Sequence, residues 1–489
     1  MIQDIKNICS RKHIKYLIIL LLGMFIAAAI EMVGLGSVPV FIMIIVDIDV
    51  LINKFPTFFA NDYIKSIRQD YITIFGGIIL ILIFLFKNIY LSLFLFFQGK
   101  VIKILRTDTI NKLFKNYINA PYNFHIKNNP SVLIRNILQS VNGAINTIMG
   151  TLSIIRESLV LIVIFILLFL NEPKVSVSVF ITLILITGIF MFFTKQTLLS
   201  RGERVQLLQG DRLRTLEHTF GSIKETKVLN RENYLTNLFT HQVDEIEKHS
   251  FFAYFLSVTP RLFLEFIAVF AVSIIAILFV IINLSNEQII PLISLLAVCA
   301  IRLIPAFNLI ISSFSARRFH LASLKLISRE MVNVPTGDKF RAKNLVGEKN
   351  HKNFSFKDQI KFENVFFSHE NSNAKILQNI SLEIKQGQKI GFIGKSGAGK
   401  STLIDLILGL IKPTKGNIFM DDLILNENLE PWQKLIGYVP QDIYLLDDTI
   451  KNNIAFGLNT NDINQEVILK SLELSRLKDY VGSLEKKEN

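Results

Sequence analysis

Residues 394–401 combine the residue types that bind nucleotide phosphates. They read Gly-Lys-Ser-Gly-Ala-Gly-Lys-Ser, which matches the pattern G-x-x-x-x-G-K-[ST]. Glycines let backbone N–H groups face the phosphates, and the start of the next helix adds a favourable dipole. Lys400 is expected to reach the outer phosphates, and the Ser401 hydroxyl to bind Mg²⁺. The predicted phosphate site comprises Gly394, Lys395, Ser396, Gly397, Ala398, Gly399, Lys400, Ser401 and Thr402.

A strand and a helix must hold this loop. Lys389–Ile393 is apolar enough for a buried strand, and Lys400–Leu410 has the apolar face of a helix. Around them strands and short helices alternate, which predicts an α/β core. The further predicted elements are strands at Gln359–Phe367, Ile376–Lys385, Gly416–Met420 and Ile436–Val439, and a helical patch at Pro431–Leu435.

The composition of the chain is that of an integral membrane protein. Hydrophobic residues make up 51% of the 489, 40 of them are Phe, and the mean hydropathy is +0.43. The net charge is +13, but Lys and Arg are spread between the apolar segments, which indicates membrane orientation and not nucleic-acid binding. Cys9 and Cys299 are the two cysteines, so no disulfide framework is predicted.

Six apolar runs reach the roughly 20 residues that a membrane-spanning helix needs. Two long polar segments, 99–147 and 195–261, are rich in Lys and Arg, so we expect both in the cytoplasm together with the two ends of the chain. The first run is too long for a signal peptide and is predicted to be a retained span. The predicted spans are 16–46, 71–98, 148–170, 175–194, 262–283 and 288–314.

These segments give three predicted regions: a transmembrane domain at 1–320, a linker at 321–357, and a nucleotide-binding domain at 358–489. With Phe362–Ser368 and Val439-Pro440-Gln441, this arrangement resembles the exporter half-transporters of the ATP-binding cassette family. The resemblance implies a homodimer in the bacterial inner membrane, a membrane all-α domain of six helices followed by an α/β domain, and ATP and Mg²⁺ as cofactors. It implies that Gln441 helps to hold Mg²⁺ and the attacking water. His369 stands where the family usually has an aromatic residue against adenine.

After Gln441 the chain departs from the family pattern. Residues 447–454 are typical of the helical subdomain, but no L-S-G-G-Q-like sequence, no apolar strand ending in Asp-Glu and no following switch histidine occur before Asn489. The resemblance therefore implies an incomplete α/β domain. Because phosphoryl transfer depends on those groups, we expect this chain alone to hydrolyse ATP poorly, and its last domain to be weakly stable. A partial sequence record, a frameshifted gene and a split gene would each produce this same incomplete pattern.

Several ionisable residues interrupt the apolar spans, where they are costly and point to function. Lys87 and Arg302 have no opposite charge within four residues, although Glu31 is able to compensate one of them, whereas Arg261 can pair with Glu265 on one helix face. Lys87, Arg261 and Arg302 are thus candidates for binding an anionic cargo, since basic side chains match phosphate.

The cargo prediction rests on a second resemblance. Pro260–Glu265 and Arg302–Ala306 resemble the fifth and sixth spans of bacterial flippases for lipid-linked oligosaccharides. This implies ATP-driven movement of an anionic lipid-linked saccharide across the inner membrane. Two alternatives stay open: an exporter of another amphiphile such as a lipid or peptide, and a catalytically dead membrane protein that interferes with an intact partner.

Short helices are expected at the tips of the two long cytoplasmic loops, because Pro or Gly interrupts the helical pattern there before it resumes. The candidates are Pro121–His125 followed by Ser131–Asn136, and Gly221–Thr226. The family resemblance implies that these helices dock on the nucleotide-binding domain.

Overall fold

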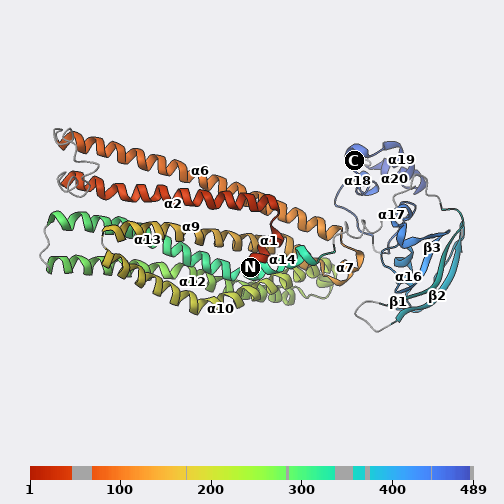
Figure 1. Cartoon of the computed structure of the whole chain (residues 1–489). Coiled ribbons are helices and arrows are strands. Elements are labelled where there is room, and N and C mark those ends of the chain that lie inside the picture. The colour runs from red at the N-terminus through yellow and green to blue at the C-terminus, as the bar shows by residue number, and fades with distance from the viewer. Residues whose placement is uncertain are drawn as a thin grey trace. The chain divides into compact units, whose positions relative to one another are not determined.

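The computed structural model divides into two compact units, Met1–Val346 and Gly347–Asn489 (Figure 1). It describes residues 1–46, 69–171, 173–281, 286–335, 356–368, 375–441 and 443–484. His369 and most of the predicted linker therefore lie outside the described residues.

The first unit is entirely helical in its described part. Six long helices run lengthwise beside one another, with contacts between α2 and α6, α9 and α13, α10 and α12, and α12 and α13 (Figure 1). The helices are α1 Ile2–Ile8, α2 Arg11–Val46, α6 Gln69–Ile118, α7 Tyr122–Lys127, α8 Pro130–Arg135, the π-helix Asn136–Ser140, α9 Val141–Asn171, α10 Pro173–Gly221, α11 Ile223–Val228, α12 Glu232–Ile281, α13 Asn286–Phe319 and α14 Leu321–Asn333.

Each predicted span falls within one long helix in its described part, and residues 282 and 283 of the fifth span lie outside the described residues. In the described residues, five helices are long and apolar enough to cross a membrane. They are α2, α6, α10, α12 and the continuous helix Pro130–Leu170, which includes α9. The sixth predicted span lies in α13, whose side chains are described only from residue 301 onward. At 1.5 Å per residue, the 50-residue helices α6 and α12 are about 75 Å long, which exceeds the roughly 30 Å of a bilayer core. Both helices therefore extend well beyond the membrane.

The prediction that residues 321–357 form a linker is wrong for its first third. Residues 321–333 form the helix α14, whose Leu324 and Ile327 are fully buried. They pack with Leu113, Ile145 and other residues in one hydrophobic cluster of the first unit. The apolar positions 324, 327 and 331 have helical spacing. Charged residues lie between them, so the segment was predicted to be a polar linker.

The second unit has a four-stranded sheet in the order β2-β1-β3-β4, and every described strand pair is antiparallel. Buried Phe362 and Ile418 of the sheet pack with Leu403 and Leu406 of α16. The elements are β1 Gln359–Ser368, β2 Lys375–Lys385, α16 Lys400–Ile407, β3 Lys415–Met420, β4 Leu423–Ile424, α17 Leu429–Gln433, α18 Ile450–Ile454, α19 Gln465–Leu474 and α20 Lys478–Ser483, with 3₁₀ turns at Leu425–Glu427 and Thr460–Asp462.

The strands predicted at 359–367, 376–385 and 416–420 are confirmed, but those at 389–393 and 436–439 are wrong. Neither segment forms a strand, and Ile393 and Val439 are 98% and 83% exposed. A strand needs a hydrogen-bonded neighbour, and all described ladders involve β1 to β4. Apolar sequence alone therefore does not make these two segments strands.

Candidate functional site

The glycine-rich loop 394–399 has the backbone shape that its sequence predicts. Gly397 and Gly399 adopt the left-handed φ values of +80° and +85°, and Gly399 caps the start of α16. A Cβ at Gly399 would lie only 2.8 Å from Cδ2 of Leu377. Glycine is required there for two reasons, the backbone conformation and the close approach of β2.

Lys400 is held over its own loop. Its Nζ donates hydrogen bonds to the carbonyl oxygens of Gly394 and Lys395, at 2.8 Å and 2.9 Å. The positive charge of Lys400 therefore lies next to the loop. Only these two solvent-exposed hydrogen bonds hold the amine there among the described contacts. The amine is free to exchange these carbonyls for phosphate oxygens.

The loop also offers backbone donors. The amide of Ala398 is used internally, by Lys395 O, but among the described hydrogen bonds the amides of Ser396 and Gly397 reach no acceptor. The first-turn amides of α16 likewise have no partner inside the helix. Unpaired amides, a helix N-terminus and an ammonium group together fit a polyphosphate. Ser401, the predicted Mg²⁺ ligand, lies in the same first turn.

Gln441 is exposed and lies in a non-helical segment. Among the described residues no hydrogen bond or ion pair joins Gln441 to Lys400 or Ser401, so its part in a Mg²⁺ site stays a prediction. Nor do the described residues contain a cluster of three or more His, Cys, Asp and Glu able to hold a metal ion by themselves. A magnesium site here would thus depend on phosphate oxygens as well as on Ser401, as is usual for this ion.

Glu31, buried inside the first unit, connects two of the predicted cargo residues. Its Oε1 lies 3.3 Å from Nζ of Lys87 and 2.9 Å from Nε of Arg302, so α2, α6 and α13 meet at one carboxylate. The Glu31 and Lys87 side chains are 4% and 11% exposed, and that of Arg302 is 31% exposed. We call these three residues the Glu31 cluster. It retains one net positive charge.

Two details of the Glu31 cluster bear on ligand binding. A Cβ at Gly34 would lie 3.0 Å from Cδ of Lys87, so the glycine makes room for the lysine stem. The Nε–H of Arg302 lies close to Glu31 but meets no acceptor at hydrogen-bond geometry within the described structure. Its attraction to the carboxylate is therefore electrostatic.

Arg261 is separate from the Glu31 cluster. It pairs with Glu265 one turn further along α12, Nε to Oε1 at 2.6 Å, and both side chains are largely exposed. Arg156 and Glu157 of α9 also neutralise one another, at 2.8 Å. The structure thus joins Lys87 and Arg302 but not Arg261, and no excess charge remains on the two local pairs.

Short helices occur at both predicted loop tips, as α7 with α8 and as α11. A hydrogen-bond network that no sequence pattern indicates holds the first of them. Arg135 is 7% exposed and donates hydrogen bonds to Asn136 Oδ1 at 2.8 Å and to Gln206 O at 3.1 Å. The Asn136 amide donates in turn to the Tyr117 hydroxyl at 3.0 Å. That hydroxyl donates to the Glu330 carboxylate of α14 at 2.7 Å. Burial above all raises the pKa of Tyr117, so its hydroxyl remains a donor.

Family profiles account for both units. The profile of the ABC transporter transmembrane region matches residues 16–301, more than half of the chain, and that of the ABC transporter ATP-binding domain matches residues 377–486. The chain belongs to the ABC transporter family. It is a multi-pass membrane protein in which an exporter-type helical domain precedes an ATP-binding cassette, and the loop 394–401 lies within the residues matched to that cassette.

Individual relatives of this ABC transporter are distant. An ATP-dependent lipid A-core flippase of Ralstonia nicotianae is 23% identical over 376 residues, which are 76% of this chain and 62% of the flippase. The mitochondrial iron-sulfur clusters transporter of Kluyveromyces lactis is 36% identical over 130 residues, 26% of this chain and 18% of that protein. A bacterial Atm1-family ABC exporter with ATP bound shares the fold, with a TM-score of 0.70 over 97% of this chain and 79% of that one, at 15% identity.

These similarities correct one prediction. Flippases of lipid-linked oligosaccharides are not singled out by the comparisons, which include flippases of lipid A-core instead. The short patterns at 260–265 and 302–306 identify the exporter class but not a subfamily.

Proposed function

We propose that this protein is an ATP-driven exporter that flips an anionic lipid-linked saccharide across the bacterial inner membrane. The observation that carries the proposal is the Glu31 cluster, in which two basic side chains share one carboxylate, so that the described residues leave one positive charge uncompensated. An uncompensated cation there is costly unless it serves a ligand. An anionic group that reaches Arg302 would restore neutrality.

The residues divide the work between the two units. In the cassette, the amides of loop 394–399 and Lys400 bind the phosphates, Ser401 and Gln441 would hold Mg²⁺, and Gln441 would also orient water. Bound Mg²⁺ supplies charge neutralisation on the outer phosphates. In the membrane unit, Lys87 and Arg302 attract the anion while Glu31 fixes their positions. Arg261, paired with Glu265, is the weakest of the three predicted cargo residues.

Assembly and orientation belong to the same proposal. An exporter half-transporter needs a second copy, so we propose a homodimer, with the cassette in the cytoplasm where ATP is. The Lys and Arg excess of segments 99–147 and 195–261 supports that orientation. The activity of the whole protein is part of the proposal, because the chain spans 62% of the length of its Ralstonia relative.

Translocation assays with the full-length protein in liposomes test this function. A fluorescent phosphatidylglycerol analogue reports anionic cargo, and dithionite quenching reports how much of it has changed leaflet. We expect MgATP to accelerate translocation and Lys400→Met to abolish the acceleration. Equal rates with and without MgATP would refute the proposal.

A second candidate is an exporter of a different, uncharged amphiphile. It is favoured by the range of relatives, since a transporter of iron-sulfur clusters from Kluyveromyces lactis is 36% identical over 130 residues. A cassette therefore does not determine the cargo. A phosphatidylcholine analogue, which carries no net charge, would then be moved as fast as phosphatidylglycerol.

A further inference from the structure

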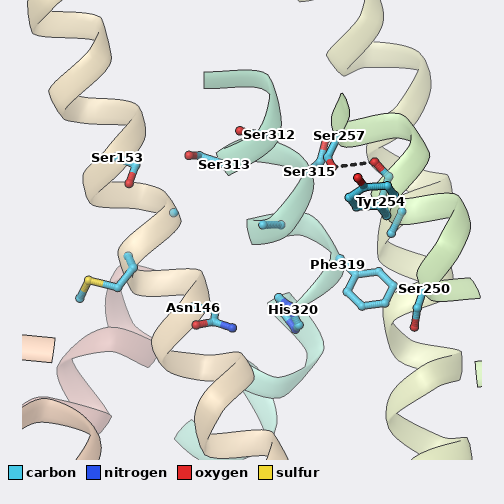
Figure 2. Close-up of a pocket in the computed structure, with 14 residues that line it drawn as sticks. Asn146, Ser153, Ser250, Tyr254, Ser257, Ser312, Ser313, Ser315, Phe319 and His320 are labelled. Atoms are coloured by element: carbon cyan, nitrogen blue, oxygen red, sulfur yellow. Dashed lines mark hydrogen bonds between the residues drawn. The ribbon is translucent and has the colours of Figure 1, made fainter. Parts of the chain in front are cut away.

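A hydroxyl-lined cavity of about 500 Å³ lies between α9, α12 and α13 of the membrane unit. Figure 2 shows serine side chains from all three helices around it. Helix α9 contributes Ser153, α12 contributes Ser250 and Ser257, and α13 contributes Ser312, Ser313 and Ser315.

The cavity lining carries no acidic or basic side chain apart from the imidazole of His320. Burial lowers the pKa of His320, so the ring is neutral at pH 7 and both donates and accepts. Asn146 adds one amide (Figure 2). An ionic ligand would find no counter-charge among these groups, whereas a neutral ligand rich in hydroxyls would find a partner for each.

Ser315 contributes an unpaired hydroxyl to the wall of the cavity. The residue is 2% exposed, and its hydroxyl has no hydrogen-bond partner in the described structure. A buried hydroxyl without a partner costs about 1–3 kcal/mol. Neighbouring hydroxyls are satisfied locally, since Ser257 donates to Tyr254 O at 2.7 Å and Ser312 to Leu309 O at 3.2 Å, and their oxygens can still accept.

Two aromatic rings complete the lining. Tyr254 of α12 and Phe319 at the end of α13 face the space beside the serines (Figure 2). Flat apolar surfaces next to hydroxyls match the two kinds of surface on a sugar ring, its C–H face and its O–H edge. Gly150 lets the helices approach here, because a Cβ on it would lie 3.0 Å from the carbonyl oxygen of Ser313.

We propose that this cavity binds an uncharged saccharide of one or two rings. The site lies where the predicted spans 148–170, 262–283 and 288–314 meet polar sequence, so the sugar could be the headgroup of a lipid or a free glycoside. Neither Lys87 nor Arg302 lines the cavity. The inference thus goes beyond the proposed anion site and requires neither ATP nor transport.

Native mass spectrometry of the full-length protein in detergent micelles tests the site. The lipid probe is monogalactosyl diacylglycerol, compared with diacylglycerol that carries the same acyl chains. The free-sugar probe is methyl β-galactoside, measured by saturation-transfer NMR. We expect galactose-dependent binding in at least one arm, and the arm that responds identifies the source. No preference for the galactolipid together with no NMR signal would overturn the proposal.

Three variants localise the binding. Ser315→Ala removes the unpaired hydroxyl and should weaken sugar binding roughly five- to tenfold. Ala253→Phe fills the cavity without removing a polar group and should abolish binding. Ser200→Ala, on the exposed side of α10, is the matched control and should bind like the unmodified protein. Unchanged sugar binding in Ala253→Phe would place the sugar elsewhere and refute the assignment.

Discussion

Replacing Glu31 by Gln should destabilise the membrane unit more than removing either of its partners. At an effective dielectric constant of about 20, each contact of Glu31, at 3.3 Å and 2.9 Å, contributes roughly 5 kcal/mol of gross attraction. Desolvation offsets most of this in the intact cluster. Glu31→Gln keeps the shape but leaves two neighbouring cations uncompensated, which should cost about 3–5 kcal/mol. Lys87→Met leaves the balanced pair of Glu31 and Arg302 and should cost much less.

Thermal unfolding of the helical unit in lipid nanodiscs measures this order of stability. We expect the lowest midpoint for Glu31→Gln, a higher one for Lys87→Met, and partial recovery in the double variant. Glu245→Gln is the matched control, because Glu245 pairs with Lys248 on the surface of α12. It should leave the midpoint unchanged. If Lys87→Met were as damaging as Glu31→Gln, the charge argument would be refuted.

Three further predictions concern the ATP-binding cassette. Lys400→Met should weaken MgATP binding about 10- to 100-fold in equilibrium dialysis, since a charge-assisted phosphate contact is lost. Trp432→Phe should cost about 1–3 kcal/mol in urea-dependent proteolysis, because Nε1 donates to the partly buried carbonyl of Ile407 at 2.7 Å. Burial raises the pKa of Asp421, but three backbone amides outweigh it and hold the pKa below its usual range. Its stabilisation is therefore present above pH about 4 and lost as the pH falls further, and Asp421→Asn should remove that pH dependence of unfolding.

The phosphate loop could be predicted because its chemistry is local. Eight consecutive residues contain the amides, the lysine and the hydroxyl, and the left-handed φ values fall on two glycines of the motif. The strands at 359–368 and 375–385 could be predicted for the same reason, because they are neighbours in the sequence and pair directly with each other. The long spans follow from hydropathy alone.

Predictions failed where the structure of a segment depends on contacts with residues far away in the sequence. Residues 389–393 and 436–439 have strand-like composition but no strand beside them. The network from Arg135 to Glu330 joins residues 195 positions apart, and no spacing in the sequence indicates it. Glu31 was expected to compensate one cation, whereas the packing of α2 against α6 and α13 gives it two.

We propose that ATP bound at loop 394–401 drives an anion past Lys87 and Arg302. The most direct test is the charge selectivity of MgATP-driven translocation by the full-length protein, with phosphatidylglycerol and phosphatidylcholine analogues measured side by side. We predict that Lys87→Ala and Arg302→Ala slow the anionic analogue by about tenfold and leave the zwitterionic one unaffected. An equal effect of both variants on the two analogues would contradict the account.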